Sequence, residues 1–114
     1  MEETLFTKII ARKVPAKIEY EDERYIVIQD INPQAPVHVL VVPRTHVATL
    51  NDLTAADDDL VGAMVRAGAK IAKDRGVDGP GFRTVFNCNA QAGQTVFHIH
   101  LHVLGGRVMT WPPG

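Results

Sequence analysis

Four of the five histidines in this sequence stand where their side chains could do chemistry together. His98, His100 and His102 alternate with apolar residues in one short segment, and His38 lies in a separate apolar run. Side chains on a β-strand point alternately to its two faces, so the three alternating imidazoles are expected on one face. A buried imidazole needs a hydrogen-bond partner, which makes three on one face a costly arrangement for a purely structural core. The pattern therefore indicates a functional site.

Metal binding is one chemistry that such a cluster supports, because imidazole is a common ligand of zinc and copper. Same-face neighbours on a strand lie roughly 6.8 Å apart, so two rings can converge on one ion, whereas the outer two of three are about twice as far apart. His38 is the candidate for a further ligand, and the segment with three histidines contains no Asp or Glu. This hypothesis gives no role to the loop before the histidines, and we predict no metal and no cofactor.

Nucleophilic catalysis at phosphorus is the second chemistry. A neutral imidazole is available near pH 7, attacks phosphorus and forms a labile N–P bond that water can hydrolyse. The flanking rings would then fix the tautomer and the orientation of the middle one, His100. Gly93-Gln94-Thr95 lies just before the histidines and offers backbone N–H groups for phosphate oxygens. Because this hypothesis uses the loop as well as the histidines, we favour it.

The elements that must position the histidines follow from apolar periodicity and turn residues. Thr95 to Leu104 and Phe82 to Cys88 are expected to pair as antiparallel strands, because only a short connection separates them. The apolar residues between the histidines, Phe97 among them, would pack on a long helix between Thr54 and Gly76. The other expected elements are a short helix within Thr4 to Lys13, a hairpin of Ile18 to Tyr20 with Arg24 to Gln29, and a strand over Val37 to Val42. About five strands and two helices make one α+β domain over residues 1–114.

Composition excludes several classes of function. The chain of 114 residues carries 12 Lys plus Arg against 13 Asp plus Glu, a net charge of −1, so no basic surface for nucleic acid or an anionic membrane is expected. The single cysteine, Cys88, cannot form an internal disulfide. The N-terminal residues have neither the pattern of a signal peptide nor that of a membrane span. We therefore expect a cytoplasmic protein that binds neither nucleic acid nor a membrane.

The histidine segment resembles the motif of a known family. His98-Ile99-His100-Leu101-His102-Val103-Leu104 matches the histidine triad (HIT) pattern, in which histidines alternate with apolar residues. Further stretches resemble the histidine triad nucleotide-binding (Hint) branch, among them Leu5 to Ile10, Asp30 to His38, and the ending Trp111-Pro112-Pro113-Gly114. The resemblance covers nearly the whole chain, and the ending favours this branch over the diadenosine polyphosphate hydrolases.

The resemblance implies a fold, an assembly and an activity. The fold is HIT-like, with an antiparallel sheet of about five strands, one long helix and one short helix. Two chains would form a homodimer with one continuous ten-stranded sheet. The activity is hydrolysis of purine nucleoside 5′-phosphoramidates, and more slowly of aminoacyl adenylates, through a covalent nucleotidyl-histidine intermediate that yields AMP or GMP without a metal. A nucleotide-binding regulatory module with vestigial activity and a dinucleoside polyphosphate hydrolase remain as alternatives.

The resemblance also implies a role for individual residues. His100 would be the nucleophile, His38 and His98 would orient and polarise it, and His102 would contact oxygens of the α-phosphate. Thr95, where the family usually has serine, would lie near the scissile bond and the leaving amine. Gly93 and Gln94 would meet the α-phosphate, and Asn87 would bond to phosphate or to the leaving group. The ribose contact would come from Asp30, the base pocket from Leu5, Phe6, Ile9, Ile28 and Ile31, and a contact to the partner subunit's site from Trp111.

Overall fold

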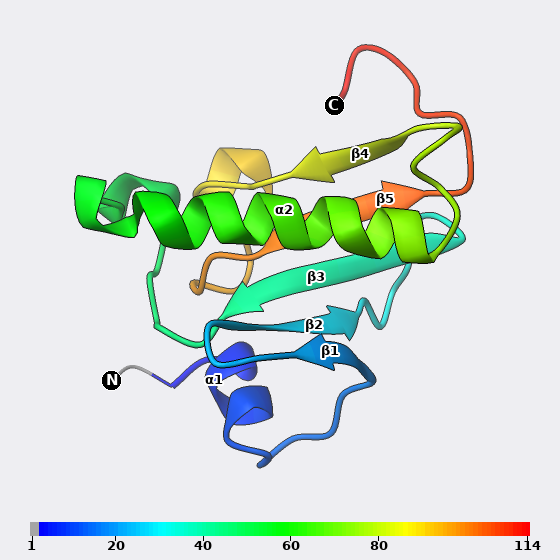
Figure 1. The fold of residues 1–114 in the computed structure, drawn as a ribbon. Helices are drawn as coiled ribbons and strands as arrows, with labels where there is room; N and C mark the ends of the chain where they lie inside the picture. The colour runs from blue at the N-terminus through cyan, green and yellow to red at the C-terminus, as the bar shows by residue number, and fades with distance from the viewer. Residues whose placement is uncertain (1–2) are drawn as a thin grey trace.

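The framework of the protein is a five-stranded antiparallel sheet in the order β1-β2-β3-β5-β4, seen in a computed structural model that describes residues 3–114 (Figure 1). The strands are β1 (Ile18–Glu21), β2 (Tyr25–Gln29), β3 (Val37–Pro43), β4 (Phe82–Val85) and β5 (Leu101–Gly105). The helices are α1 (Leu5–Ile10) and α2 (Asp58–Asp74), with short 3₁₀ turns at Leu50–Asp52, Ala55–Asp57 and Ala90–Ala92. The predicted α+β class, with about five strands, one long helix and one short helix, is confirmed.

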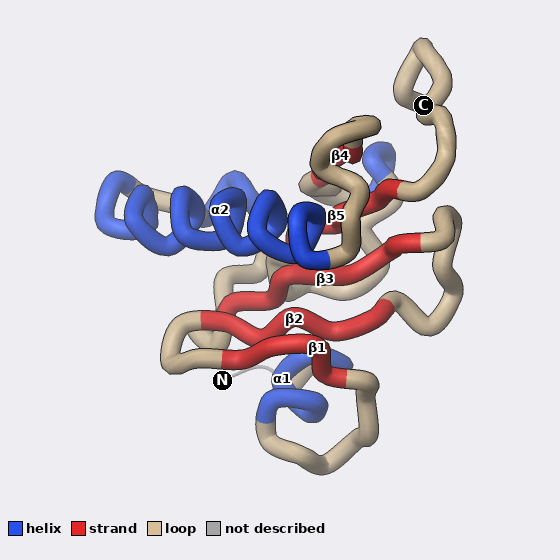
Figure 2. Tube along the Cα trace, turned by 45° about the vertical axis from the view of Figure 1, so that its right-hand side comes forward, coloured by secondary structure: helices blue, strands red, loops and turns tan. Residues whose placement is uncertain are grey.

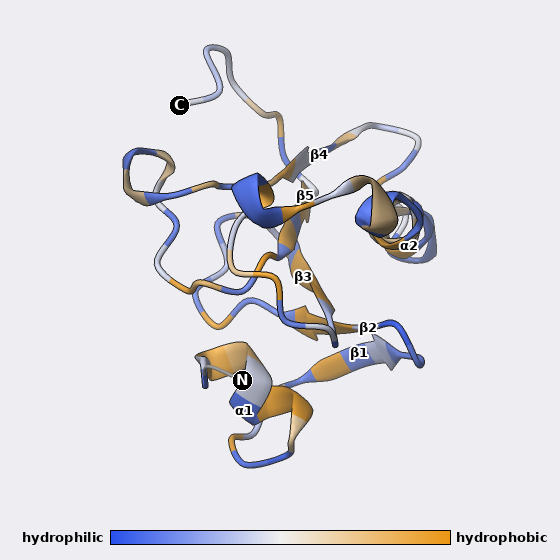
Figure 3. Cartoon of the chain, turned by 90° about the vertical axis from the view of Figure 1, so that its left-hand side faces the viewer, coloured by the Kyte–Doolittle hydropathy of each residue, from blue (hydrophilic) through white to orange (hydrophobic). Residues whose placement is uncertain are grey.

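The two helices lie on opposite faces of the sheet (Figure 3). On one face α2 packs an apolar stripe that includes Met64 and Ala67 against alternate residues of β2, β3 and β5. On the other face α1 packs Phe6 and Ile9 against residues of β2 and β3, including Leu40. β3 is buried along its whole length because it lies under both helices. Since side chains alternate along a strand, His38 in β3 and His102 in β5 fall on the α1 face.

A threonine caps α1 and another caps the 3₁₀ turn before α2, whereas α2 itself begins at Asp58 without a side-chain cap. At α1, the Thr4 hydroxyl accepts a hydrogen bond from the Thr7 N–H, while the Thr7 hydroxyl accepts one from the Thr4 N–H. At the turn that leads into α2, the Asp57 carboxylate likewise accepts from the Thr54 N–H, which is a capping box between near neighbours in the sequence. α1 ends at Ile10, three residues earlier than expected, because Arg12 takes a left-handed conformation with φ of 62°.

The strand that carries the histidines is shorter than predicted. It begins at Leu101 rather than Thr95, and its partner β4 ends at Val85 rather than Cys88. The segment before β5 bends toward the chain that follows β3, where the Ile99 N–H donates to the Val47 carbonyl over 2.8 Å. As a result Phe97, which was expected to pack on the long helix, is 40% exposed. His98 and His100 therefore lie in a bent segment ahead of the strand.

Gly105 at the end of β5 is expected to be intolerant of any side chain. A Cβ built there would lie 2.7 Å from Cγ2 and 2.9 Å from Cβ of Val77, which follows α2. Gly105→Ala should therefore lower the free energy of unfolding by about 1–3 kcal/mol in urea denaturation. Gly62→Ala, in an open position on α2, is the matched control and should stabilise the protein slightly. If Val77→Ala fails to recover part of the loss in the double variant, the steric explanation is wrong.

Among residues 3–114, no helix combines the length and the apolar character needed to cross a bilayer.

Candidate active site

A cavity of about 300 Å³ opens on the α1 face of the sheet, a size suited to a small-molecule ligand. One wall is apolar and comes mainly from α1, from the chain after it and from β2. The other wall carries polar side chains from four separate parts of the sequence. The lining residues are Leu5, Phe6, Ile9, Val14, Pro15, Ala16, Ile28, Gln29, Asp30, Ile31, Leu40, Asn87, Gly93, Thr95, Val96, His100 and His102. The cavity thus suits a ligand with an apolar ring at one end and polar groups at the other.

The tautomer of His100 is fixed by its own backbone. Its Nδ1 lies 2.8 Å from the carbonyl oxygen of His98, and a carbonyl can only accept a hydrogen bond, so Nδ1 must carry the proton. In the neutral ring the lone pair is therefore on Nε2. Burial lowers the pKa of His100 below the ordinary 6.5, against smaller opposing effects of the His98 carbonyl and of Asp30. At neutral pH the cavity wall thus holds an uncharged imidazole with a free nucleophilic nitrogen.

Phe6 holds the ring of His100 from the apolar side. The two ring centroids are 4.8 Å apart in an edge-to-face arrangement, and Phe6 itself is buried. Phe6 also lies edge-on to His98, with centroids 5.9 Å apart. The short helix α1 therefore supplies both part of the apolar wall of the cavity and the packing that desolvates the central histidine.

His38 and His102 form a directed hydrogen-bond chain across the β3–β5 pair. The Gln34 backbone N–H donates to His38 Nδ1 over 3.0 Å, so the proton of neutral His38 is on Nε2. That N–H lies 2.9 Å from His102 Nδ1, which accepts it and leaves His102 with a proton on Nε2. Burial is the main reason why the pKa of His102 falls to about 4. Neutral His102 therefore carries an N–H donor at Nε2 on the wall of the cavity, next to His100.

The Asp30 carboxylate lies beside this chain, a contact that was not predicted from the sequence. Its Oδ2 is 3.3 Å from His38 Nε2, and its Oδ1 accepts the Asn32 N–H over 2.8 Å in a tight turn. Each carboxylate oxygen has two acceptor positions, so one remains free on each for the ribose hydroxyls predicted as its partners. A signal was available, because Asp30 and His38 flank one short loop and the ends of such a loop meet.

The same three side chains are the group best placed to hold a metal. Ligand atoms of Asp30, His38 and His102 all lie within 4.8 Å of one another. However, His38 would have to bind an ion through Nε2 and move its proton to Nδ1, where the Gln34 N–H already points. Two donors would then face each other, so a metal fits this group only if the loop before β3 rearranges.

His98 is completely buried and does not line the cavity. Its Nε2–H donates to the Pro43 carbonyl over 2.7 Å, which ties the bent segment to the end of β3. Its Nδ1 has no partner among the described residues. Burial lowers the pKa of His98 to about 4 despite the Pro43 hydrogen bond, so the ring is neutral. His98 thus acts on His100 through its backbone carbonyl, with its ring as the anchor.

The loop before the bent segment is braced by Gln94. The buried side-chain amide of Gln94 accepts the Asn89 N–H and donates to the carbonyls of Ala48 and Val96. It does not line the cavity, whereas Asn87, Gly93 and Thr95 do. The side chain of Gln94, predicted to meet phosphate, is thus engaged in holding the loop that presents its neighbours.

Trp111 is a predicted site residue that lies on the exposed end of the chain. It is 81% exposed, in the stretch after β5 that forms neither helix nor strand (Figure 2). Within residues 3–114 of this chain it does not line the cavity.

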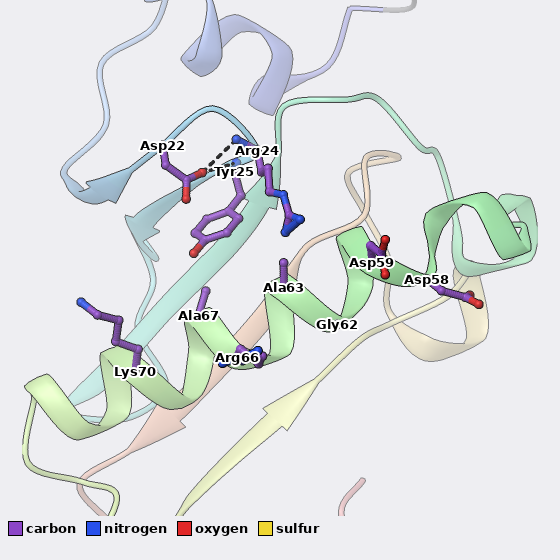
Figure 4. A pocket seen from close by; sticks show the side chains of 10 residues that line it. All are labelled: Asp22, Arg24, Tyr25, Asp58, Asp59, Gly62, Ala63, Arg66, Ala67 and Lys70. Atoms are coloured by element: carbon purple, nitrogen blue, oxygen red, sulfur yellow. Dashed lines mark hydrogen bonds between the residues drawn. The ribbon is translucent and has the colours of Figure 1, made fainter.

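A wider groove of about 570 Å³ lies between α2 and the β1–β2 turn (Figure 4). It carries cations and anions in equal number: Arg24, Arg66 and Lys70 with Asp22, Asp58 and Asp59. Figure 4 shows the Tyr25 side chain between β2 and α2, and Asp22 bonded to the neighbouring backbone. None of its lining residues is a histidine, so the groove lacks the imidazoles that line the first cavity.

Comparison with known proteins agrees with this geometry. The family model described as "Scavenger mRNA decapping enzyme C-term binding" matches residues 3–110. The chain is 44% identical to the purine nucleoside phosphoramidase of Escherichia coli over 93% of this chain and 89% of that protein. It is 49% identical to an uncharacterized HIT-like protein of Synechocystis over 99% and 98% of the two chains. A HIT family hydrolase from Legionella pneumophila superposes with a TM-score of 0.96 at 46% identity, over 98% of this chain and all of that one.

The fold and the site together define an α+β protein whose antiparallel sheet presents a histidine cluster to a ligand cavity. The comparisons give that class its name. The chain belongs to the histidine triad family, as a HIT family hydrolase.

Proposed function

We propose that this protein hydrolyses the P–N bond of purine nucleoside 5′-phosphoramidates, and more slowly aminoacyl adenylates, in the cytoplasm and without a metal. The observation that carries the proposal is the fixed tautomer of His100, which leaves a lone pair on Nε2 of a ring that lines the cavity. The name of the Escherichia coli relative supports the same activity.

The reaction proceeds in two steps at phosphorus. His100 Nε2 attacks the α-phosphorus, the bond to the leaving nitrogen breaks, and a nucleotidyl-histidine forms. The positive charge that develops on the ring is stabilised by the Nδ1–H bond to the His98 carbonyl. Water then attacks phosphorus and releases His100. Over the whole cycle the hydroxyl of this water goes to the nucleotide, and its proton goes to the leaving amine. The Thr95 hydroxyl also lines the cavity, and we assign it a position near the leaving amine.

The phosphate is held by neutral donors. His102 offers its Nε2–H, and Asn87 offers its side-chain amide from the polar wall. None of the described lining residues is Lys or Arg, so the cavity has no cation for additional phosphates. We therefore expect phosphoramidates to be cleaved faster than dinucleoside polyphosphates in a panel of adenosine and guanosine substrates. Faster cleavage of dinucleoside polyphosphates would contradict the proposal.

Asp30 is expected to bind the ribose hydroxyls. Asp30→Ala should lower kcat/KM about 10- to 100-fold with an adenosine phosphoramidate, since hydrogen bonds to a charged group contribute about 1.5–3 kcal/mol. A 2′-deoxy substrate should lose a comparable factor with the wild-type enzyme. Asp30→Ala and the 2′-deoxy substrate remove the same interaction. The 2′-deoxy substrate should therefore cost the Asp30→Ala variant little further activity. Fully multiplicative losses would show that Asp30 does not contact the ribose.

We propose further that two chains form a homodimer in which Trp111 acts in the partner's site. Trp111 and Val108 are 81% and 86% exposed on a tail that leaves the sheet beside its edge strand β4, which supports a second copy as their environment. Trp111→Ala and His100→Ala variants should each be defective alone. Mixed dimers should regain activity, because one subunit then combines an intact His100 with the partner's tryptophan. Light scattering that shows a monomer, or mixing that restores nothing, would contradict this arrangement.

A further inference from the structure

The turn that follows β5 touches the loop before β3 at two points. Gly106 has φ of +91°, and a Cβ built there would lie 2.9 Å from Cβ of Pro36. The next residue, Arg107, donates from Nε to the Gln34 carbonyl over 2.9 Å. The two contacts come from neighbouring residues and reach the same loop, so together they fix where the backbone of residue 34 lies.

That loop decides which nitrogen of His38 carries the proton. The Gln34 N–H points at His38 Nδ1 from 3.0 Å, which forces the proton onto Nε2. The other group that faces these nitrogens is the Asp30 carboxylate, 3.3 Å from His38 Nε2 and 4.0 Å from His102 Nδ1. The carboxylate would accept a proton from either ring, so it does not choose between them. The backbone N–H of Gln34 makes that choice.

The choice has a consequence in the cavity. With the proton of His38 on Nε2, His102 accepts at Nδ1 and keeps its own proton on Nε2. With the opposite arrangement, His102 would carry its proton on Nδ1 and present a lone pair at Nε2. A lone pair repels a phosphate oxygen, whereas an N–H binds it.

We propose that Gly106 and Arg107 are positioning residues that set the tautomers of His38 and His102 through the backbone of Gln34. The catalytic consequence rests on the proposed function, whereas the tautomers themselves do not. Neither residue lines the cavity, so both act at a distance from the substrate.

The test is to read the ring tautomers directly by ¹⁵N-edited NMR of histidine-labelled protein and to measure kinetics in parallel. Wild type should show Nε2–H on His38 and His102, and Nδ1–H on His100. Arg107→Ala should give mixed tautomers at His38 and His102 but leave His100 unchanged, with kcat lowered about tenfold, the factor of one hydrogen bond of about 1.4 kcal/mol, and KM little changed. Arg107→Lys retains a donor and should recover part of the loss. Arg66→Ala, an exposed arginine on α2, is the matched control and should resemble wild type.

Gly106→Ala disturbs the same loop from the second contact and should produce the same tautomer change. Wild-type tautomers and kcat in both the Arg107→Ala and Gly106→Ala variants would overturn the inference. So would a wild-type spectrum with the His38 proton on Nδ1. If the spectra change as expected but wild type does not hydrolyse phosphoramidates, the inference about tautomers stands and the proposed function fails.

Discussion

Replacement of His100 by alanine is expected to abolish steady-state hydrolysis of an adenosine phosphoramidate, with kcat reduced by about 10⁴-fold or more, as for other lost nucleophiles. The reason is that Nε2 of His100 is the nitrogen whose lone pair is left free by its backbone hydrogen bond. Nucleotide affinity should fall far less, because Asp30, the apolar wall and His102 remain. Steady-state assays measure the loss of turnover, and titration calorimetry with AMP measures the change in nucleotide affinity.

A histidine outside the cavity provides the matched control. His46 does not line the cavity, and its Nε2 bonds to the Phe97 carbonyl. His46→Ala should keep most of the activity, and circular dichroism should show that both variants are folded. Turnover of the His100→Ala protein near the wild-type rate would remove His100 from the mechanism. Loss of nucleotide binding as large as the loss of turnover would assign His100 to binding instead.

The second large effect is a loss of folding stability at acidic pH. His98 is fully buried and its pKa is lowered from 6.5 to about 4, mainly by burial. Between these two values the unfolded chain binds a proton that the folded protein does not, so stability falls as the pH falls. The stabilisation from keeping His98 neutral is fully present above pH 6.5 and is lost toward pH 4. His98 alone should account for a loss on the order of 3 kcal/mol across that window.

Urea denaturation at several pH values between 4 and 7 measures this loss. His98→Asn keeps a neutral donor for the Pro43 carbonyl but cannot take up a proton. Its stability should therefore be lower than that of wild type at neutral pH and should depend less steeply on pH. Equal slopes for the two proteins would mean that His98 is not the titrating group.

Much of the fold was predictable because its elements depend on local patterns. The apolar run of β3 predicted a strand buried on both faces, and the structure buries every residue of it. The Thr54 cap with Asp57 was equally readable, because a capping box is a contact between near neighbours. The predicted short helix was too long, because the left-handed conformation of Arg12, which ends it, cannot be recognised from the residue type.

The histidine segment shows where local patterns stop. Its alternation predicted one long strand, but the strand starts only at Leu101. The bend before it depends on bonds to Pro43 and Val47, which lie more than 50 residues earlier in the chain. Phe6 nevertheless contacts both His98 and His100, and the ring centroids of His100 and His102 lie 5.0 Å apart, although His98 does not line the cavity.

The histidine tautomers could not be predicted from the sequence. They depend on backbone groups, the His98 carbonyl and the Gln34 N–H, whose directions are set only when the loops fold. The bracing role of the Gln94 side chain was likewise hidden, because one of its partners, the Ala48 carbonyl, lies 46 residues earlier in the chain. Residue types indicated which groups could take part, whereas three-dimensional contacts determine which nitrogen of each ring carries the proton.

The most direct test of the account is to trap the covalent intermediate. The enzyme would be mixed rapidly with a nucleoside phosphoramidate, quenched in base, in which an N–P bond survives, and analysed by peptide mass spectrometry. We expect one nucleoside monophosphate attached at His100 Nε2, lost on brief treatment with acid. Attachment to another residue, or full turnover with no adduct at any time, would contradict the claim that His100 is the nucleophile.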